Sequence, residues 1–139
     1  MKLPPPVPIV DDNAVIFGYR YSSGAFVADD NAAAGEPFEN PRTPSGRPGS
    51  RAPQLLVERD GQRLSTIDLF GGRWVLATGP TGSPWSDFAR GLTRTGVPRL
   101  HCHSVGPAGD LRDVEHRWSA VYGVPSEGAV LIRPDGFIA

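Results

Sequence analysis

The only cysteine of the chain, Cys102, lies between two of its three histidines, His101 and His103. Thiolate and imidazole groups act as nucleophiles, as bases and as zinc ligands. Residues 100–105 have the pattern of a strand, in which the two histidines share one face and Cys102 points to the other. Three converging metal ligands would therefore need a group from elsewhere, and His116 is the only other histidine. We predict a buried structural cysteine, two surface histidines and no metal site.

A second place for chemistry is the start of an expected helix at Ser83, directly after an apolar strand over residues 74–78. Thiol-based redox proteins place a thiolate at such a helix start, where the helix dipole lowers the thiol pKa. Residues 82–87 (GSPWSD) contain no cysteine, and Asp87 would disfavour a thiolate nearby. We interpret Ser83 as a helix cap and predict no catalytic residue in the chain.

Two further groups of side chains allow a structural interpretation. Asp110, Asp113 and Glu115 lie near the start of a second expected helix, where carboxylates favour the helix dipole and Asp113 can cap. Tyr19, Arg20 and Tyr21 could contact a partner surface through aromatic and cation–π interactions. They could equally form an ordinary strand with one packed face, and the sequence leaves both interpretations open.

Four large aromatic residues, Trp74, Trp85, Trp118 and Tyr122, could line a ligand cavity or fill the core. Trp85 belongs to an i, i+3, i+4, i+7 apolar pattern that continues through Leu92. Because aromatic residues at helical spacing usually pack inward, we favour the core.

Length and composition limit the function classes. The 139 residues suit one domain, and glycine (17) and proline (15) make up about 23% of them, just under the share typical of disorder. A net charge of −1 gives no general attraction to nucleic acid or anionic lipid. One cysteine excludes an internal disulfide, and prolines replace the apolar core of a signal peptide near the N-terminus. We predict a cytoplasmic protein without nucleic-acid or membrane partners.

The elements that must position these residues divide the chain at residue 53. Residues 1–53 form an arm rich in proline and glycine, with one expected strand at about 14–21 and a linker over 29–53 that allows neither helix nor central strand. Residues 54–139 form the expected domain. Its predicted elements are a hairpin around Asp60-Gly61, a helical turn at 67–70, strands at 74–78, 100–105 and 129–132, helices starting near Ser83 and Asp113, and a terminal turn at Pro134-Asp135-Gly136.

This order indicates the fold class. A strand–helix–strand unit followed by a helix and a terminal hairpin gives an α/β fold whose mixed central sheet is flanked by helices. The arrangement is thioredoxin-like.

Several segments carry a resemblance to a known family. They are 17–23 (FGYRYSS), 47–53 (RPGSRAP), Asp60-Gly61, 65–71 (STIDLFG), 74–76 (WVL), Asp110-Leu111, Trp118, Tyr122-Gly123 and 128–137 (GAVLIRPDGF). Together they resemble the C-terminal thioredoxin-like domain of flavin-dependent aromatic hydroxylases, which include phenol and polyketide hydroxylases. The resemblance covers about residues 14–138.

That family keeps its FAD and its substrate pocket in domains that precede this one. The chain has no Gly-x-Gly-x-x-Gly after a strand, so we expect no cofactor on it and FAD only on a flavoprotein partner or on upstream domains. The resemblance implies a non-catalytic module that supports or dimerises a hydroxylase, in aromatic polyketide biosynthesis. The alternative is a stand-alone enzyme or ligand-binding protein that acts on an aromatic polyketide.

Overall fold

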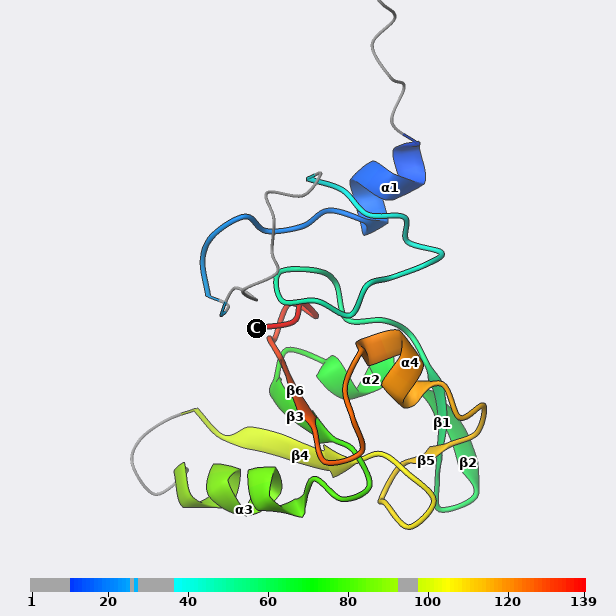
Figure 1. Cartoon of the computed structure of the whole chain (residues 1–139), viewed down its shortest axis with the longest axis vertical. Coiled ribbons are helices and arrows are strands. Elements are labelled where there is room, and N and C mark those ends of the chain that lie inside the picture. The colour runs from blue at the N-terminus through cyan, green and yellow to red at the C-terminus, as the bar shows by residue number, and fades with distance from the viewer. Residues whose placement is uncertain (1–10, 26, 28–36, 93–97) are drawn as a thin grey trace, which may run out of the picture.

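The computed structural model describes residues 11–25, 27, 37–92 and 98–139. Two three-stranded sheets share one core, with short helices around them (Figure 1). In chain order the elements are α1 (Asp12–Phe17), β1 (Leu56–Arg59), β2 (Gln62–Ser65), α2 (Thr66–Phe70), β3 (Trp74–Thr78), α3 (Ser83–Leu92), β4 (Leu100–Ser104), β5 (Arg112–Asp113), α4 (Trp118–Tyr122) and β6 (Ala129–Ile132).

The central sheet is mixed, as predicted, with the strand order β4-β3-β6. Strand β3 pairs in parallel with β4, with Trp74 opposite Leu100, and antiparallel with β6, with Val75 opposite Ile132. The apolar run of β3 suits this place, because the middle strand of a covered sheet has both faces against other groups.

The predicted hairpin is confirmed, but it lies outside the central sheet. Asp60 and Gly61 both have positive φ, 51° and 77°, which is the backbone of a two-residue hairpin turn. Strand β1 then pairs on its other side with β5, a strand of two residues that local sequence did not predict. The hairpin and β5 form the second sheet, in the order β2-β1-β5.

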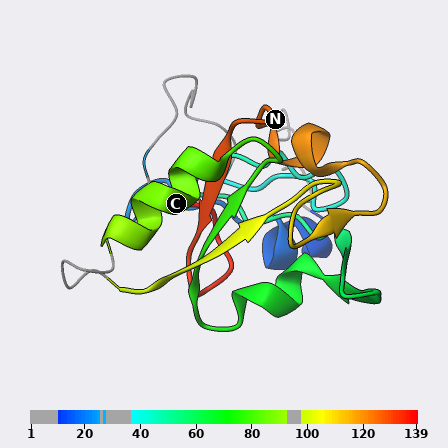
Figure 2. The same cartoon turned by 90° about the horizontal axis from the view of Figure 1, so that it is seen from below.

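The two faces of the central sheet have different partners. Alternate residues of β3 and β6, among them Val75 and Ile132, point into the core with Phe70, Trp118 and Tyr122. Helices α2 and α4 lie on this side of the sheet, whereas α3 lies on the other (Figure 2). The expected flanking of a mixed sheet by helices is therefore confirmed.

Local capping residues place most of the helices. The Ser65 hydroxyl accepts from the Ile67 N–H, and the Asp68 carboxylate accepts from the Ser65 N–H, which starts α2 at the predicted helical turn. Asp113 accepts from the Trp118 N–H at 2.7 Å, so it caps α4 across an intervening turn. Helix α4 thus begins later than expected.

The strand expected at residues 14–21 is wrong, because α1 occupies Asp12–Phe17. The Asp11 carboxylate accepts from the Asn13 N–H and caps this helix. None of its residues is buried, so the alternation of bulky side chains in the sequence does not reflect a buried sheet face. Among its described residues, the arm makes two isolated bridges, one within itself between Tyr19 and Phe38 and one from Arg51 to Phe137.

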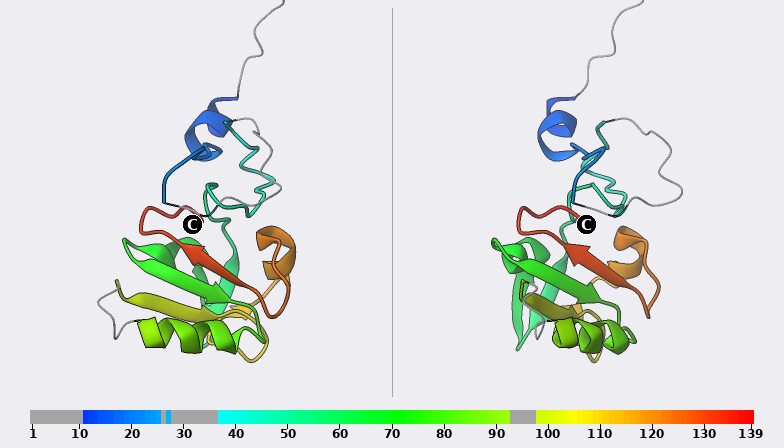
Figure 3. Two further views of the ribbon diagram at one scale, coloured as in Figure 1. Left: turned by 60° about the vertical axis from the view of Figure 1, so that its left-hand side comes forward. Right: turned by 90° about the vertical axis from the view of Figure 1, so that its left-hand side faces the viewer.

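The end of the chain folds back against residues 49–53. The turn at Pro134-Asp135-Gly136 is confirmed by the Gly136 N–H donating to the Arg133 carbonyl at 2.9 Å. Ile138 then bridges to Ile132, and Phe137 bridges to Arg51. Figure 3 shows this return beside the arm, near the C-terminus. A domain boundary at residue 53 stays a prediction. Among the helices described, none is long and apolar enough to cross a membrane.

Tyr122 joins α4 to the segment before β1. Its hydroxyl donates to the Pro53 carbonyl at 2.6 Å, and burial raises the pKa of Tyr122 well above its ordinary value, so the proton stays in place. We expect Tyr122→Phe to lower the free energy of unfolding by about 1 kcal/mol, the net value of one buried hydrogen bond. Urea unfolding measures this. Tyr19→Phe, at a partly exposed ring, is the matched control, and an equal loss of stability in both variants would contradict the assignment.

Candidate functional site

The turn before α3 lacks the features of a reactive or cofactor-binding helix start. The helix begins at Ser83, and the chain's single cysteine lies on β4 instead. The Gly79 N–H donates to Gly128, the Thr81 N–H to Ser126 and the Gly82 N–H to Gly79. A pyrophosphate cradle needs free backbone N–H groups at this place, so the turn does not fit the FAD pyrophosphate.

The glycines of this turn serve the packing of the chain itself. A Cβ on Gly79 would lie 2.2 Å from the Ser126 carbonyl oxygen, and one on Gly82 would lie 2.8 Å from Cβ of Thr78. Close approach of two backbone segments, not of a ligand, requires glycine here. Beside the turn, Trp85 Nε1 donates to the Glu127 carbonyl at 3.0 Å and ties α3 to the loop before β6.

The predicted strand at His101, Cys102 and His103 is present as β4. Burial raises the pKa of the Cys102 thiol, and the Asp110 charge acts in the same direction while Arg90 opposes it. A thiol with a raised pKa is a poor nucleophile at neutral pH. His116 lies in the turn between β5 and α4. Among the described residues, no three His, Cys, Asp or Glu side chains gather closely enough to hold a metal ion.

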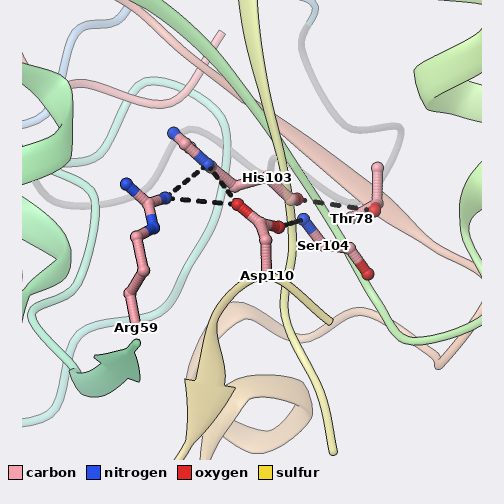
Figure 4. A network of polar contacts seen from close by, with 5 residues as sticks. All are labelled: Arg59, Thr78, His103, Ser104 and Asp110. Carbon is pink, nitrogen blue, oxygen red and sulfur yellow. Dashed lines mark hydrogen bonds and ion pairs between the residues drawn. The ribbon is translucent and has the colours of Figure 1, made fainter. Parts of the chain in front are cut away.

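The polar centre of this region is a cluster of Arg59, His103 and Asp110 (Figure 4). His103 Nδ1 lies 2.8 Å from Asp110 Oδ2 and 2.9 Å from Arg59 Nη2, and Arg59 Nη2 donates to the same Oδ2 at 3.2 Å. The second oxygen, Oδ1, accepts from the Ser104 N–H. Local sequence predicts Asp110 at a helix start, and it does not predict the contact with Arg59, which comes from the end of β1.

The chemistry of the imidazole decides how the cluster is bonded. One nitrogen cannot both accept from Arg59 and donate to Asp110. With the proton on Nδ1, the imidazole and the guanidinium both donate to the carboxylate. Without it, a lone pair would face that carboxylate at 2.8 Å, so the protonated Nδ1 is favoured. Asp110 thus joins the second sheet, through Arg59 of β1, to the central sheet, through His103 of β4.

Asp110 also carries the clearest electrostatic signal of the cluster. Partial burial acts to raise its pKa, but the hydrogen bonds from His103 and Ser104 and the charges of His103 and Arg59 outweigh burial and lower it. The carboxylate is charged, held by several donors and engaged on both oxygens. Such a group suits a structural link better than a general base, which needs a pKa near the working pH.

The other predicted acidic residues also have structural partners. Asp113 caps α4 through one oxygen, whereas its Oδ1 is buried without a partner, as is Trp118 Nε1. Glu115 pairs with Arg117 at 3.2 Å on the surface. The structure therefore places Asp110 in the cluster with His103 and Arg59, and does not bring Asp113 and Glu115 to it.

The aromatic–cation group of the arm makes contacts within the chain. The Tyr21 ring packs edge-on against Phe137 at 4.8 Å, and the Arg133 guanidinium lies over the Tyr21 ring at 4.8 Å. Tyr19 packs against Tyr21 and remains partly exposed. The sequence left open whether these side chains contact a partner or pack within the chain, and the Tyr21 ring packs within the chain.

An apolar groove of about 770 Å³ lies between α3, the central sheet and residues 24, 25 and 27 of the arm. Its lining side chains are all apolar or aromatic. They include Trp74, Leu76, Trp85, Phe88, Leu100 and Leu131. Trp85 is 48% exposed and Phe88 is 64% exposed, while Trp118 and Tyr122 are buried. The expectation that these aromatic residues fill the core is thus confirmed for Trp118 and Tyr122 and wrong for Trp85.

The sequence contained a signal for this groove. The α3 pattern supplies four apolar positions, and the even-numbered residues of β3 and β4 supply more on the facing side of the sheet. One helix of ten residues cannot cover them all. Only Ala89 of the four α3 positions is buried.

Comparisons with known proteins agree on one group. A family model described as aromatic-ring hydroxylase, C-terminal, matches residues 45–139. Aklavinone 12-hydroxylase RdmE of Streptomyces purpurascens is 47% identical over 125 residues, which are 89% of this chain and 22% of that protein. A 4-methyl-5-nitrocatechol 5-monooxygenase of Burkholderia sp is 40% identical over 134 residues, 94% of this chain and 24% of that protein.

Solved structures give the same result. A ternary complex of aklavinone-11 hydroxylase with FAD and aklavinone aligns with a TM-score of 0.83 and 43% identity over 94% of this chain and 24% of that one. The flavin-dependent monooxygenase PieE in complex with FAD and substrate aligns at 0.77 and 38%, over 91% of this chain and 22% of that one. The chain therefore spans roughly a quarter of the length of these proteins.

The lowered pKa of Asp110 predicts a pH-dependent stability. A carboxyl whose pKa is lower in the folded state than in the unfolded state stabilises the fold at pH values above its ordinary pKa of 3.8. This contribution is lost as the pH falls through the folded-state value. We expect Asp110→Asn to destabilise the protein at pH 7 and the difference from wild type to shrink below about pH 4.

Urea midpoints between pH 7 and pH 2 measure this dependence. Asp87→Asn, at the exposed ion pair with Arg90, is the control and should change stability by less than about 0.5 kcal/mol. Parallel pH profiles of wild type and Asp110→Asn would disprove the link.

Proposed function

The chain belongs to the aromatic-ring hydroxylase C-terminal domain family, and from this premise we propose that it is a non-catalytic module acting through protein–protein contact. It supports or dimerises an FAD-dependent aromatic hydroxylase, in aromatic polyketide biosynthesis. The observation that carries the proposal is the apolar groove between α3 and the central sheet, with Trp85 and Phe88 largely exposed. FAD belongs, in this proposal, to the flavoprotein that the module contacts.

The character of the groove favours a protein surface as its occupant. A site for one small molecule combines apolar walls with a few polar groups that fix the ligand's orientation. The groove is lined by glycine, alanine, valine, leucine, phenylalanine and tryptophan only. The indole N–H of Trp85 already donates to the chain's own backbone. Wide, apolar and open surfaces of this kind mark protein contacts.

The chemistry of the remaining residues supports the same choice. The pKa of the Cys102 thiol is raised. The Asp110 carboxylate accepts hydrogen bonds from His103, Arg59 and the Ser104 N–H. The N–H groups of Gly79, Thr81 and Gly82 in the turn before α3 donate to carbonyl groups of the chain itself. None of these groups is poised as a nucleophile or a base. A module that supports a catalytic partner needs a stable contact surface and no reactive group of its own.

A second candidate function is a stand-alone enzyme or ligand-binding protein acting on an aromatic polyketide. The volume of the groove favours it, since about 770 Å³ lies within the range of ligand sites. Relatives include proteins named aklavinone 12-hydroxylase, tetracenomycin A2 monooxygenase-dioxygenase and putative polyketide hydroxylase.

An activity assay separates the two candidates. We expect the chain expressed alone to retain no flavin after gel filtration with excess FAD, and to show no phenol-dependent oxidation of NAD(P)H. Flavin absorbance and nicotinamide absorbance measure these outcomes. Retained flavin together with turnover would refute the non-catalytic proposal and support the second candidate.

The docking surface is tested by Phe88→Glu, which places a charge in the groove. Ile67→Glu is the matched control, because Ile67 is 49% exposed on α2, outside the groove. Sedimentation velocity is run on the chain alone and on its mixture with aklavinone 12-hydroxylase lacking the matching segment. We expect association in one of these samples that Phe88→Glu weakens about tenfold, or 1.4 kcal/mol, and that Ile67→Glu leaves unchanged. Equal weakening by both variants, or no association in either sample, would contradict the proposal.

A further inference from the structure

Strand β4 forms one edge of the central sheet, and part of its backbone is unpaired. The Thr78 carbonyl accepts from the Val105 N–H at 2.8 Å, and Thr78 lies opposite Ser104 in a parallel register. In a parallel ladder this pattern directs the N–H and C=O groups of odd-numbered β4 residues toward β3. The groups of Leu100, Cys102 and Ser104 therefore point away from the sheet.

The chain itself covers only one end of this edge. At Ser104, the N–H donates to Asp110 Oδ1 and the carbonyl accepts from the Leu111 N–H at 3.0 Å. No corresponding partner is found for the outward groups of Leu100 and Cys102 among the residues that the structure describes. Within the described part of the chain, the N–H and C=O groups of Leu100 and Cys102 are therefore available to pair with another strand.

A groove of about 430 Å³ runs along the open part of the edge, and its charge is positive. Arg90, Arg99, Leu100, His101, Cys102 and His103 line this cationic groove together with Ala89. Partial burial lowers the pKa of His101, and the positive charges of Arg73 and Arg99 lower it further. Arg73 and Arg99 form no ion pair with any residue in the described ranges. The nearby acids are engaged, Asp87 with Arg90 and Asp110 with Arg59 and His103.

We propose that the open edge of β4 binds an extended acidic segment of a partner protein as an additional strand. Backbone hydrogen bonds to Leu100 and Cys102 supply the pairing, and the cationic groove selects the charge. Because successive side chains of a strand point to opposite faces, the partner segment should alternate acidic and apolar residues. Acidic side chains lie on the face of His101 and His103, and apolar side chains on the face of Leu100 and Cys102.

A second copy of this chain fits the edge poorly. Because the free groups belong to Leu100 and Cys102, two antiparallel β4 strands would pair about His101. Each copy would then bring its own Arg99 to the cationic groove of the other, and like charges that face each other destabilise a pair of strands. The occupant is therefore an acidic segment of different sequence.

This inference goes beyond the proposed support function and does not depend on it. The apolar groove between α3 and the sheet accepts a nonpolar surface, whereas the β4 edge accepts a charged, extended backbone. The contact at the apolar groove and the contact at the β4 edge can therefore exist independently of each other.

The probe is a synthetic six-residue peptide of alternating glutamate and valine, added to the full ¹⁵N-labelled chain. We expect hydrogen exchange of the Leu100 and Cys102 amides to slow at least about tenfold, as two edge groups gain partners. A lysine–valine peptide and a glutamate–valine peptide methylated on alternate amide nitrogens should give no protection. Equal protection by the lysine peptide, unprotected Leu100 and Cys102 amides, or shifts centred on Trp85 and Phe88 would overturn the proposal.

Two variants test the edge from the side of the protein. Cys102→Pro removes an outward N–H but no ladder bond to β3, and edge strands tolerate such a proline. We expect it to abolish protection at Leu100 while circular dichroism stays unchanged. Arg99→Glu should weaken peptide binding by about three- to tenfold, and Arg47→Glu, at an exposed position outside the groove, should not. Full binding by Arg99→Glu would also overturn the proposal. The Arg99→Glu measurement remains decisive even if Cys102→Pro does not fold.

Discussion

Among the described helices, only the ten-residue helix α3 packs on the outer face of the central sheet, and it leaves part of that face uncovered. Helix α3 buries Ala89 against β3 and β4 but leaves Trp74, Leu100 and Leu131 partly uncovered. The opposite face has α2, α4 and the second sheet to pack against, so its residues form the core. This unequal covering produces the apolar groove, and the strand order β4-β3-β6 places β4 at an edge of the sheet.

The elements set by local interactions were predictable from the sequence. Asp60-Gly61 specifies a turn, Ser65 and Asp68 cap each other across α2, and Gly123 takes the left-handed conformation that ends α4. Elements that depend on distant partners were not predictable. Strand β5 exists only because Val57 and Glu58 lie beside it, and no local pattern marks two residues as a strand. In the arm, bulky alternation suggested a strand, but with no strand beside it the capped helix forms.

The same division holds for the candidate site. The alternation of His101, Cys102 and His103 follows from strand geometry alone, and β4 is where the sequence placed it. Arg59 meets Asp110 from 51 positions earlier in the chain, and only the packing of two sheets brings them together. The exposure of Trp85 and Phe88 could be suspected only by comparing the apolar area on α3 with the area available to bury it.

The position of β3 has a consequence for biosynthesis. Both neighbours of β3 follow it in the chain, and β6 leaves the ribosome after β4. The hairpin of β1 and β2 can close early, but its own third strand also arrives late. During translation the nascent chain therefore exposes Val75 and Ala77 until β6 emerges. Premature termination before Ala129 yields a product without a closed sheet, a natural target for proteolysis and chaperones.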